Sequence, residues 1–278
     1  MKFEFSKLHG AGNDFIVVDD SSRKWSRSPF FISKLCCRHT GIGADGMIFL
    51  SKLDAGNVDC RMEFFNNDGH SAGMCGNGLR CAAKFAANYL FCRKKKIVFK
   101  TDSGNLNTEI LEKDLVRVEI PVLEEPEKIF PEGHEFYFVN TGVPHLICLK
   151  DDISNLDIDT HGSYWRNHPD FKPNGVNVDF LEINSKSKII SIRTFERGLE
   201  CESNACGTGI AAAALALFHF GGMLPPFSFQ THSNDRIIID FSFDGNRLIK
   251  EKKVLLTGNA IEVYRGTLIK EDLSCKHR

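Results

Sequence analysis

The chain has 278 residues, a formal net charge of −1, and a composition that is 42% hydrophobic and 26% charged. Such a composition is typical of a folded globular protein, and the length favours two domains of similar size. The nearly balanced charge offers no general attraction to nucleic acid or to an anionic membrane surface, and no apolar run approaches the ~18 residues that a membrane-spanning helix needs.

The first residues, MKFEFSKLHGAGNDF, contain no apolar stretch long enough for a secretory signal, so we expect a cytoplasmic protein. Disulfides do not persist in that compartment. The ten cysteines include no CxxC pair and no Cys/His cluster with the spacing of a zinc site. They are therefore expected to be free thiols that hold no metal.

Predicted strands dominate both halves of the chain. Segments rich in β-branched and aromatic residues, separated by turn residues, lie at 3–10, 14–20, 45–52, 58–66, 96–104, 106–113 and 115–122. The pattern resumes at 134–142, 145–150, 176–183, 188–197, 227–232, 236–243 and 254–266. Between the two sets, residues 123–133 are acidic and proline-containing and are predicted to be a linker. We expect an N-terminal lobe of residues 1–120, joined by the tail 264–278, and a C-terminal lobe of residues 121–263.

Helix signals are few. One segment is Pro29–Arg38, and the other two follow Cys75 and Cys206. The last two are apolar or small on nearly every face, and a helix without a polar face must be buried on all sides. The pattern therefore predicts an α+β fold of two similar lobes, produced by an internal duplication. Each lobe would be a curved sheet or open barrel around one central helix, with the active site in the cleft between the lobes.

The sequences CGNG and CGTG place a thiol, Cys75 or Cys206, immediately before each buried helix. The first N–H groups of a helix have no partner within it and form the positive end of its dipole, so this position favours thiolate over thiol. A substrate carboxylate can also bind these N–H groups. They belong to Gly76, Asn77, Gly207 and Thr208.

A pair of such thiols suits two-base racemisation. If the lobes face each other, one sulfur removes the α-proton of a small acid as a thiolate. The other sulfur delivers a proton to the opposite face as a thiol. The N–H groups that hold the carboxylate would stabilise the charge that develops on it.

At these motifs the chain resembles the diaminopimelate epimerase family over essentially its whole length. The ordered set is HGAGNDF (9–15), GIGADG (41–46), FFNNDG (64–69), CGNGLRC (75–81), TGVPH (141–145), ERG (196–198) and ACGTG (205–209). The resemblance implies the interconversion of LL- and meso-diaminopimelate by the Cys75–Cys206 pair, without metal or pyridoxal phosphate. It also implies a place in lysine biosynthesis and peptidoglycan precursor synthesis.

The resemblance further assigns roles to individual residues. His145 and Glu196 would set the protonation of the thiols, and Arg197 would clamp the distal carboxylate of the substrate, since guanidinium matches carboxylate bidentately. The residues implied to line the substrate site are Asn13, Asn66, Asn177, Glu196 and Arg197.

Three departures from the family pattern lie near the implied substrate site. Gly46 stands where many members have Gln, Val143 stands where many have Asn, and the segment before Cys206 carries one extra residue. Fewer polar anchors should weaken discrimination at the distal end of the substrate more than proton transfer. We therefore expect relaxed selectivity, including glutamate as a side activity.

Other functions remain open at this point. A proline racemase-like isomerase of the same fold would also use paired cysteines. A dithiol redox protein would cycle Cys75 and Cys206 as a disulfide. A metal or pyridoxal enzyme is not excluded by sequence alone. Symmetric dimers are the commonest assembly, so a homodimer is expected on that ground only.

Overall fold

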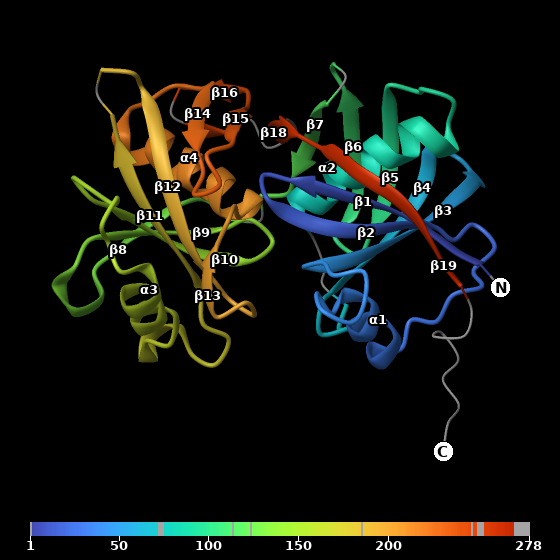
Figure 1. Cartoon of the computed structure of the whole chain (residues 1–278). Coiled ribbons are helices and arrows are strands. Elements are labelled where there is room, and N and C mark those ends of the chain that lie inside the picture. Colours follow the sequence, from blue (N-terminus) through green and yellow to red (C-terminus); the bar gives the residue numbers. More distant parts are fainter. Residues whose placement is uncertain are drawn as a thin grey trace. The chain divides into compact units, whose positions relative to one another are not determined.

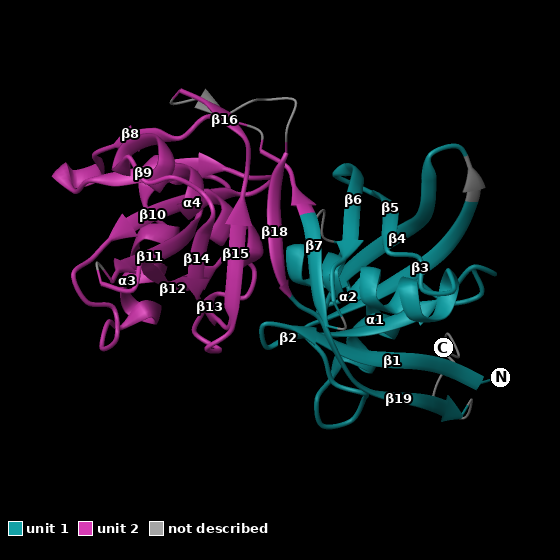
Figure 2. Cartoon of the chain, turned by 90° about the horizontal axis from the view of Figure 1, so that it is seen from above, with its two compact units in different colours: residues 1–118, 259–278 teal, residues 119–258 magenta. Residues whose placement is uncertain are grey.

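The computed structural model describes residues 2–71, 75–112, 114–122, 124–184, 186–245, 247–248 and 253–269. The chain divides into two compact units, Met1–Val118 with Asn259–Arg278, and Glu119–Gly258 (Figure 2). Residues 270–278 of the predicted tail lie outside the described residues. Within the described ranges, no helix is both long and apolar enough to cross a membrane.

The sheet of the first unit has the order β19-β1-β2-β3-β4-β5-β6-β7 (Figure 1). Its neighbouring strands are antiparallel except for β2–β3 and β4–β5, which are parallel. The strands are β1 (Lys2–Gly10), β2 (Asn13–Asp19), β3 (Gly46–Ala55), β4 (Val58–Asn66), β5 (Lys96–Thr101), β6 (Gly104–Ile110), β7 (Leu115–Ile120) and β19 (Ile261–Ile269).

The helix α2 (Gly76–Phe85) is enclosed by this sheet. It packs against β1, β2, β3, β6 and β19, which come from both ends of the strand order, and all of its residues are buried. A π-helical turn, Ala86–Leu90, continues it. The helix α1 (Pro29–Cys36) covers the other face, where Ile16, Val18 and Phe49 pack against it. Because successive side chains of a strand point to opposite faces, the sheet is apolar on both.

The second unit has the order β8-β9-β10-β11-β12-β14-β15-β18, with β10–β11 and β12–β14 parallel and the other neighbours antiparallel. The short strand β13 (Cys201–Ser203) pairs with the end of β12. The strands are β8 (Glu127–Ile129), β9 (Phe136–Asn140), β10 (Pro144–Leu149), β11 (Asn177–Ile183), β12 (Ile189–Glu196), β14 (Phe227–Gln230), β15 (Arg236–Asp240) and β18 (Val254–Asn259). A separate ribbon pairs β16 (Phe243–Asp244) with β17 (Arg247–Leu248).

The helix α4 (Gly207–Gly221) is enclosed here as α2 is in the first unit. It packs against β9, β10, β11 and β15, and residues 207–218 are all buried. It ends at Gly222, whose left-handed φ of 62° suits a glycine after a helix. The helix α3 (Ile158–Arg166) packs on the outer face of the sheet, and single 3₁₀ turns lie at Pro131–Gly133 and Pro169–Phe171.

The two units repeat one topology. From β1 to β7, and again through β9, β10, β11, β12, β14, β15 and β18, the pairs run antiparallel, parallel, antiparallel, parallel, antiparallel, antiparallel. A covering helix follows the second strand of each series and an enclosed helix follows the fourth. The predicted α+β class, with two similar lobes that each wrap a curved sheet around a buried helix, is therefore confirmed.

Two local predictions differ from the structure. The predicted linker at 123–133 contains an edge strand, β8, and a 3₁₀ turn. The helix α3 is absent from the sequence prediction, because it lies on the surface and buries only Ile158, Gly162 and Trp165. Its signal was the N-cap, where Asp157 accepts the N–H of Thr160.

Candidate active site

Cys75 is the N-cap residue of α2. Its Sγ accepts the N–H of Gly78 at 3.3 Å and lies 3.7 Å from Oδ1 of Asn13, at the start of β2. A Cβ on Gly78 would lie 3.5 Å from this sulfur and 3.2 Å from Ile48. The sulfur therefore lies over the first turn of the helix, in ordinary van der Waals reach of position 78.

A chain of oriented amides holds Asn13 beside Cys75. The fully buried Arg80 donates to Oδ1 of Asn77 at 2.9 Å and to the carbonyl of Asn259 at 3.1 Å. Nδ2 of Asn77 then donates to Oδ1 of Asn13 at 3.3 Å, and Nδ2 of Asn13 donates to Asp45 at 2.9 Å. The result is that Asn13 presents its acceptor oxygen to the thiol of Cys75.

An ion cluster supports this chain from β2. Arg38 donates to both carboxylate oxygens of Asp14 at 3.0 and 2.9 Å and to Asp45 at 2.6 Å, while Lys7 lies 2.9 Å from Asp14. Burial alone raises the pKa of Asp14, but the hydrogen bonds from Arg38 and Lys7 outweigh it and lower that pKa to about 2. Asn66, another predicted residue, lies at the exposed end of β4, opposite Gly46 of β3.

Cys206 is the N-cap residue of α4 and is only 7% exposed. A line of short contacts leads from it into the sheet. Its Sγ lies 3.3 Å from Oγ1 of Thr208, which lies 3.0 Å from Nε2 of His145 on β10. Nδ1 of His145 lies 2.7 Å from Asp179 on β11, and the other oxygen of Asp179 accepts the hydroxyl of Thr194 at 2.7 Å. His145 and Asp179 have no solvent exposure.

The expected lowering of the thiol pKa is wrong for Cys206. Burial, followed by the negative charges of Glu196 and Asp179, raises the pKa of Cys206 well above its ordinary value. Hydrogen bonds from Thr208 and from the N–H of Gly209 act in the opposite direction without offsetting this. The environment of Cys206 therefore opposes the thiolate that a helix N-terminus alone would favour.

Asn177 lies between His145 and Arg197, one of the predicted charged residues. Its Oδ1 accepts the backbone N–H of Arg197 at 2.7 Å, and its Nδ2 lies 3.4 Å from both Nε2 of His145 and the carbonyl of Pro144. The guanidinium of Arg197 donates to the carbonyl of Asn174 at 3.4 Å. The structure thus gathers most of the predicted residues into two clusters, one in each unit. These are Cys75, Asn13 and Asn77 in the first, and Cys206, His145, Asn177, Glu196, Arg197 and Thr208 in the second.

Sequence reasoning missed the residues that hold these clusters together. Thr141, for example, donates to the backbone carbonyl of Thr208 at 3.0 Å. A usable signal existed for Asp179, because it is an acidic residue within the mostly apolar strand β11, between Val178 and Phe180. The missed residues are Asp14, Asp45, Arg80, Thr141, Asp179 and Thr194.

The structure gives the surroundings of the three departures from the family pattern. A Cβ on Gly46 would lie 2.6 Å from the ring of Phe64 and 2.7 Å from the carbonyl of Phe65, so no side chain fits there. Val143 lies in the turn between β9 and β10, where its carbonyl accepts the N–H of Thr141. In the extended segment before Cys206, Glu202 makes two 2.7 Å hydrogen bonds to Arg193.

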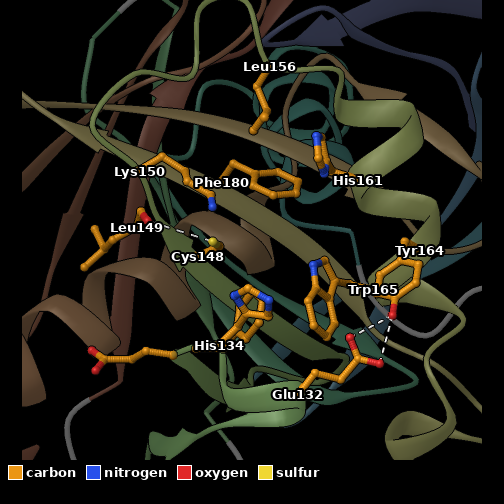
Figure 3. Close-up of a pocket in the computed structure, with 12 residues that line it drawn as sticks. Glu132, His134, Cys148, Leu149, Lys150, Leu156, His161, Tyr164, Trp165 and Phe180 are labelled. Atoms are coloured by element: carbon orange, nitrogen blue, oxygen red, sulfur yellow. Dashed lines mark hydrogen bonds between the residues drawn. The ribbon is translucent and has the colours of Figure 1, made fainter.

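A cavity of about 530 Å³ lies elsewhere in the second unit, between α3 and the sheet (Figure 3). Phe136, Cys148, Trp165 and Phe180 line it, and Tyr164 donates to Glu132 at its rim. Cys148 and His145 are an odd number of residues apart on β10, so their side chains point to opposite faces. The cavity is therefore separate from the Cys206 cluster.

Comparisons with known proteins identify the family of the chain. The model of the diaminopimelate epimerase family matches residues 5–121 and 137–254. The diaminopimelate epimerase of Aquifex aeolicus is 38% identical, with 97% of this chain and 99% of the relative covered. That of Methanothermobacter thermautotrophicus is 32% identical, with 96% and 99% covered.

Solved structures share the fold at low identity. A hydroxyproline epimerase from Agrobacterium vitis has a TM-score of 0.70 at 14% identity, covering 96% of this chain and 92% of that one. A phenazine biosynthesis protein of the PhzF family from Bacillus anthracis has a TM-score of 0.73 at 13% identity, covering 97% and 100%. The solved structures show the fold alone, whereas the family model and the sequence relatives show the family. The chain is an isomerase that belongs to the diaminopimelate epimerase family.

Proposed function

We propose that the chain converts LL-diaminopimelate to meso-diaminopimelate by two-base, cofactor-independent epimerisation through Cys75 and Cys206. The observation that carries the proposal is the repeated placement of a thiol. Each cysteine is the N-cap of the enclosed helix that follows the fourth strand of the repeated series, β4 in the first unit and β12 in the second. The family membership and the names of the relatives support the same reaction.

The proton transfers follow from the requirement that inversion uses both faces of one carbon. In one direction the thiolate of one cysteine takes the α-proton, and the thiol of the other gives its proton to the opposite face of the carbanion. The α-carboxylate would bind the N–H groups at the starts of α2 and α4, contributed by Gly76, Asn77, Gly207 and Thr208. These N–H groups stabilise the charge that moves onto the carboxylate in the transition state.

The remaining predicted residues would bind the rest of the substrate. Glu196 accepts an ammonium group, and the guanidinium of Arg197 pairs with the distal carboxylate. Asn177 would support the role of Arg197, because it holds the backbone N–H of Arg197. Asn13 and Asn66 would complete the wall contributed by the first unit.

Selectivity at the distal end would be relaxed. Phe64 and Phe65 leave no space for a polar side chain at position 46, Val143 offers none, and Glu202 is engaged by Arg193. A site with fewer polar groups at the distal end rejects a shorter substrate less strongly. L-Glutamate should therefore be racemised slowly. The absence of any D-glutamate in an assay that turns over diaminopimelate would exclude this side activity.

The assay that tests the proposed function supplies purified protein with LL-diaminopimelate and separates the stereoisomers of the product. We expect meso-diaminopimelate and solvent deuterium at the α-carbon, with full activity in a chelator. Turnover of proline with none of diaminopimelate would favour the proline racemase-like alternative. Thiol-dependent electron transfer without isomerisation would favour the redox alternative. A cytoplasmic location and a homodimeric state remain part of the proposal, to be measured by fractionation and by sedimentation.

A further inference from the structure

We propose that the hydroxyl of Thr208 relays a proton between Cys206 and His145, and that Asp179 is the positioning residue that keeps Nε2 of His145 free to receive it. The inference rests on the proposed function, in which Cys206 must alternate between thiol and thiolate. It adds two roles to that function: the side chain of Thr208 transfers the proton, and Asp179 positions His145.

The hydrogen-bond directions are fixed from the interior outward. Asp179 accepts the hydroxyl of Thr194 on one oxygen and lies 2.7 Å from Nδ1 of His145 on the other. A carboxylate only accepts, so Nδ1 carries the proton and Nε2 of the neutral ring is an acceptor. Thr208 must then donate to Nε2, and its oxygen is left to accept the S–H of Cys206.

Asn177 gives independent support for this tautomer. The backbone N–H of Arg197 donates to Oδ1 of Asn177 at 2.7 Å, which fixes the orientation of the amide. Its NH₂ group therefore faces Nε2 of His145 at 3.4 Å. A donor on this side of the ring favours the resting tautomer, in which Nε2 carries no proton.

The relay balances without any added reactant. The S–H bond of Cys206 breaks as an O–H bond forms on Thr208, and the original O–H bond of Thr208 breaks as an N–H bond forms on His145. The products are a thiolate and an imidazolium. Asp179 stabilises the imidazolium at 2.7 Å in a site without solvent exposure. The reverse transfer restores the thiol.

Such a relay is needed because the charges around Cys206 oppose its ionisation. The groups that face it are Glu196 at the end of β12, Asp179 on β11 and, through Thr208, His145 on β10. Two of these three are anionic, and the sulfur is nearly closed to water. An imidazolium formed two hydrogen bonds away supplies the positive charge that a thiolate requires.

The first test is the pH profile of Cys206 alkylation by iodoacetamide in the full chain, followed by mass spectrometry of the peptide. Thr208→Val removes the hydroxyl with little change of shape, and Thr208→Ser retains it. We expect the Val variant to be alkylated about tenfold more slowly at pH 8, equivalent to one pKa unit. The Ser variant should follow the wild-type profile. A Val variant with the wild-type profile and wild-type thermal stability would overturn the relay.

The second test reads the tautomer of His145 from ¹H–¹⁵N correlations of the ring, assigned with His145→Gln. We expect the wild-type ring to be protonated at Nδ1. Asp179→Asn should shift part of the population to the Nε2–H form, because the new amide can donate to Nδ1. A wild-type ring protonated at Nε2 would overturn the proposal.

Neither readout requires turnover. A shifted alkylation profile in a protein that fails to epimerise diaminopimelate would therefore refute the proposed substrate and leave the relay standing. Normal epimerisation of diaminopimelate by the wild type, with an unchanged alkylation profile in Thr208→Val, would refute the relay and leave the proposed substrate standing.

Discussion

Asp179 and His145 form a buried pair of a carboxylate and a neutral imidazole, with 2.7 Å between Oδ2 and Nδ1 and no exposure of either side chain. Removing His145 leaves a buried carboxylate without this partner, at a cost of about 3–5 kcal/mol, and removing Asp179 leaves a buried N–H without an acceptor, at a cost of about 1–3 kcal/mol. We expect His145→Leu and Asp179→Leu to lower the free energy of unfolding in urea by about these amounts. The double variant should be destabilised by clearly less than the sum. Additive losses would show that the pair is not coupled.

Gly209 and Gly221 offer a matched comparison within α4. A Cβ on Gly209 would lie 2.3 Å from Oδ1 of Asp179, whereas one on Gly221 would lie 3.7 Å from its nearest neighbour. Gly209→Ala should therefore cost about 1–3 kcal/mol through overpacking. Gly221→Ala should be neutral or stabilise the protein by about 0.5–1 kcal/mol through helix propensity. Equal effects on the thermal midpoint would contradict the tight contact at Asp179.

Buried thiols should make the fold sensitive to alkali. Burial raises the pKa of both Cys36 and Cys60 from 9.0 to about 12. A raised pKa gives stability that is complete below pH 9 and is lost as the pH rises toward 12, because only the unfolded thiols ionise. Each such thiol should lower the free energy of unfolding by about 1.4 kcal/mol per pH unit in this window. Cys60→Ala should show a shallower decline than the wild type, and Cys92→Ala, at an exposed cysteine, should not.

The ion cluster on β2 gives the opposite pH dependence. The pKa of Asp14 falls from 3.8 to about 2, so its contribution is complete above pH 4 and is lost as the pH falls through 2. After allowance for solvent screening, the loss should be about 1–2 kcal/mol. Arg38→Gln should remove most of this dependence in urea unfolding between pH 5 and pH 2. Lys96→Gln, which alters a largely exposed pair, should preserve it. The same acid loss in both variants would argue against Arg38 as the cause.

Local sequence signals predicted the elements that bury the most apolar surface. The strand at 58–66 matches β4 at both ends, and the two helices with no polar face are those enclosed by the sheets. The covering helix α3 escaped prediction because only one stripe of it is buried. In the same way, β8 is a three-residue edge strand that stands next to proline and glutamate.

The two cysteines could be picked out because a thiol before a glycine-rich helix start is a local feature. The groups that surround Cys206 could not. Asn177 comes opposite His145 through the register of β10 with β11, and Asp179 comes opposite Thr194 through the register of β11 with β12. Strand register depends on contacts distant in sequence. The sequence therefore did not predict that burial and the charge of Glu196 raise the pKa of Cys206, in place of the lowering expected at a helix N-terminus.

The most direct test of the central claim replaces one sulfur at a time. Cys75→Ser and Cys206→Ala are each given LL-diaminopimelate in deuterated water, and both epimerisation and α-deuterium incorporation are followed. Two-base catalysis predicts that each single variant loses epimerisation, since inversion needs an acid and a base on opposite faces of one carbon. Near-normal epimerisation by either variant would contradict the assignment of Cys75 and Cys206 as the catalytic pair.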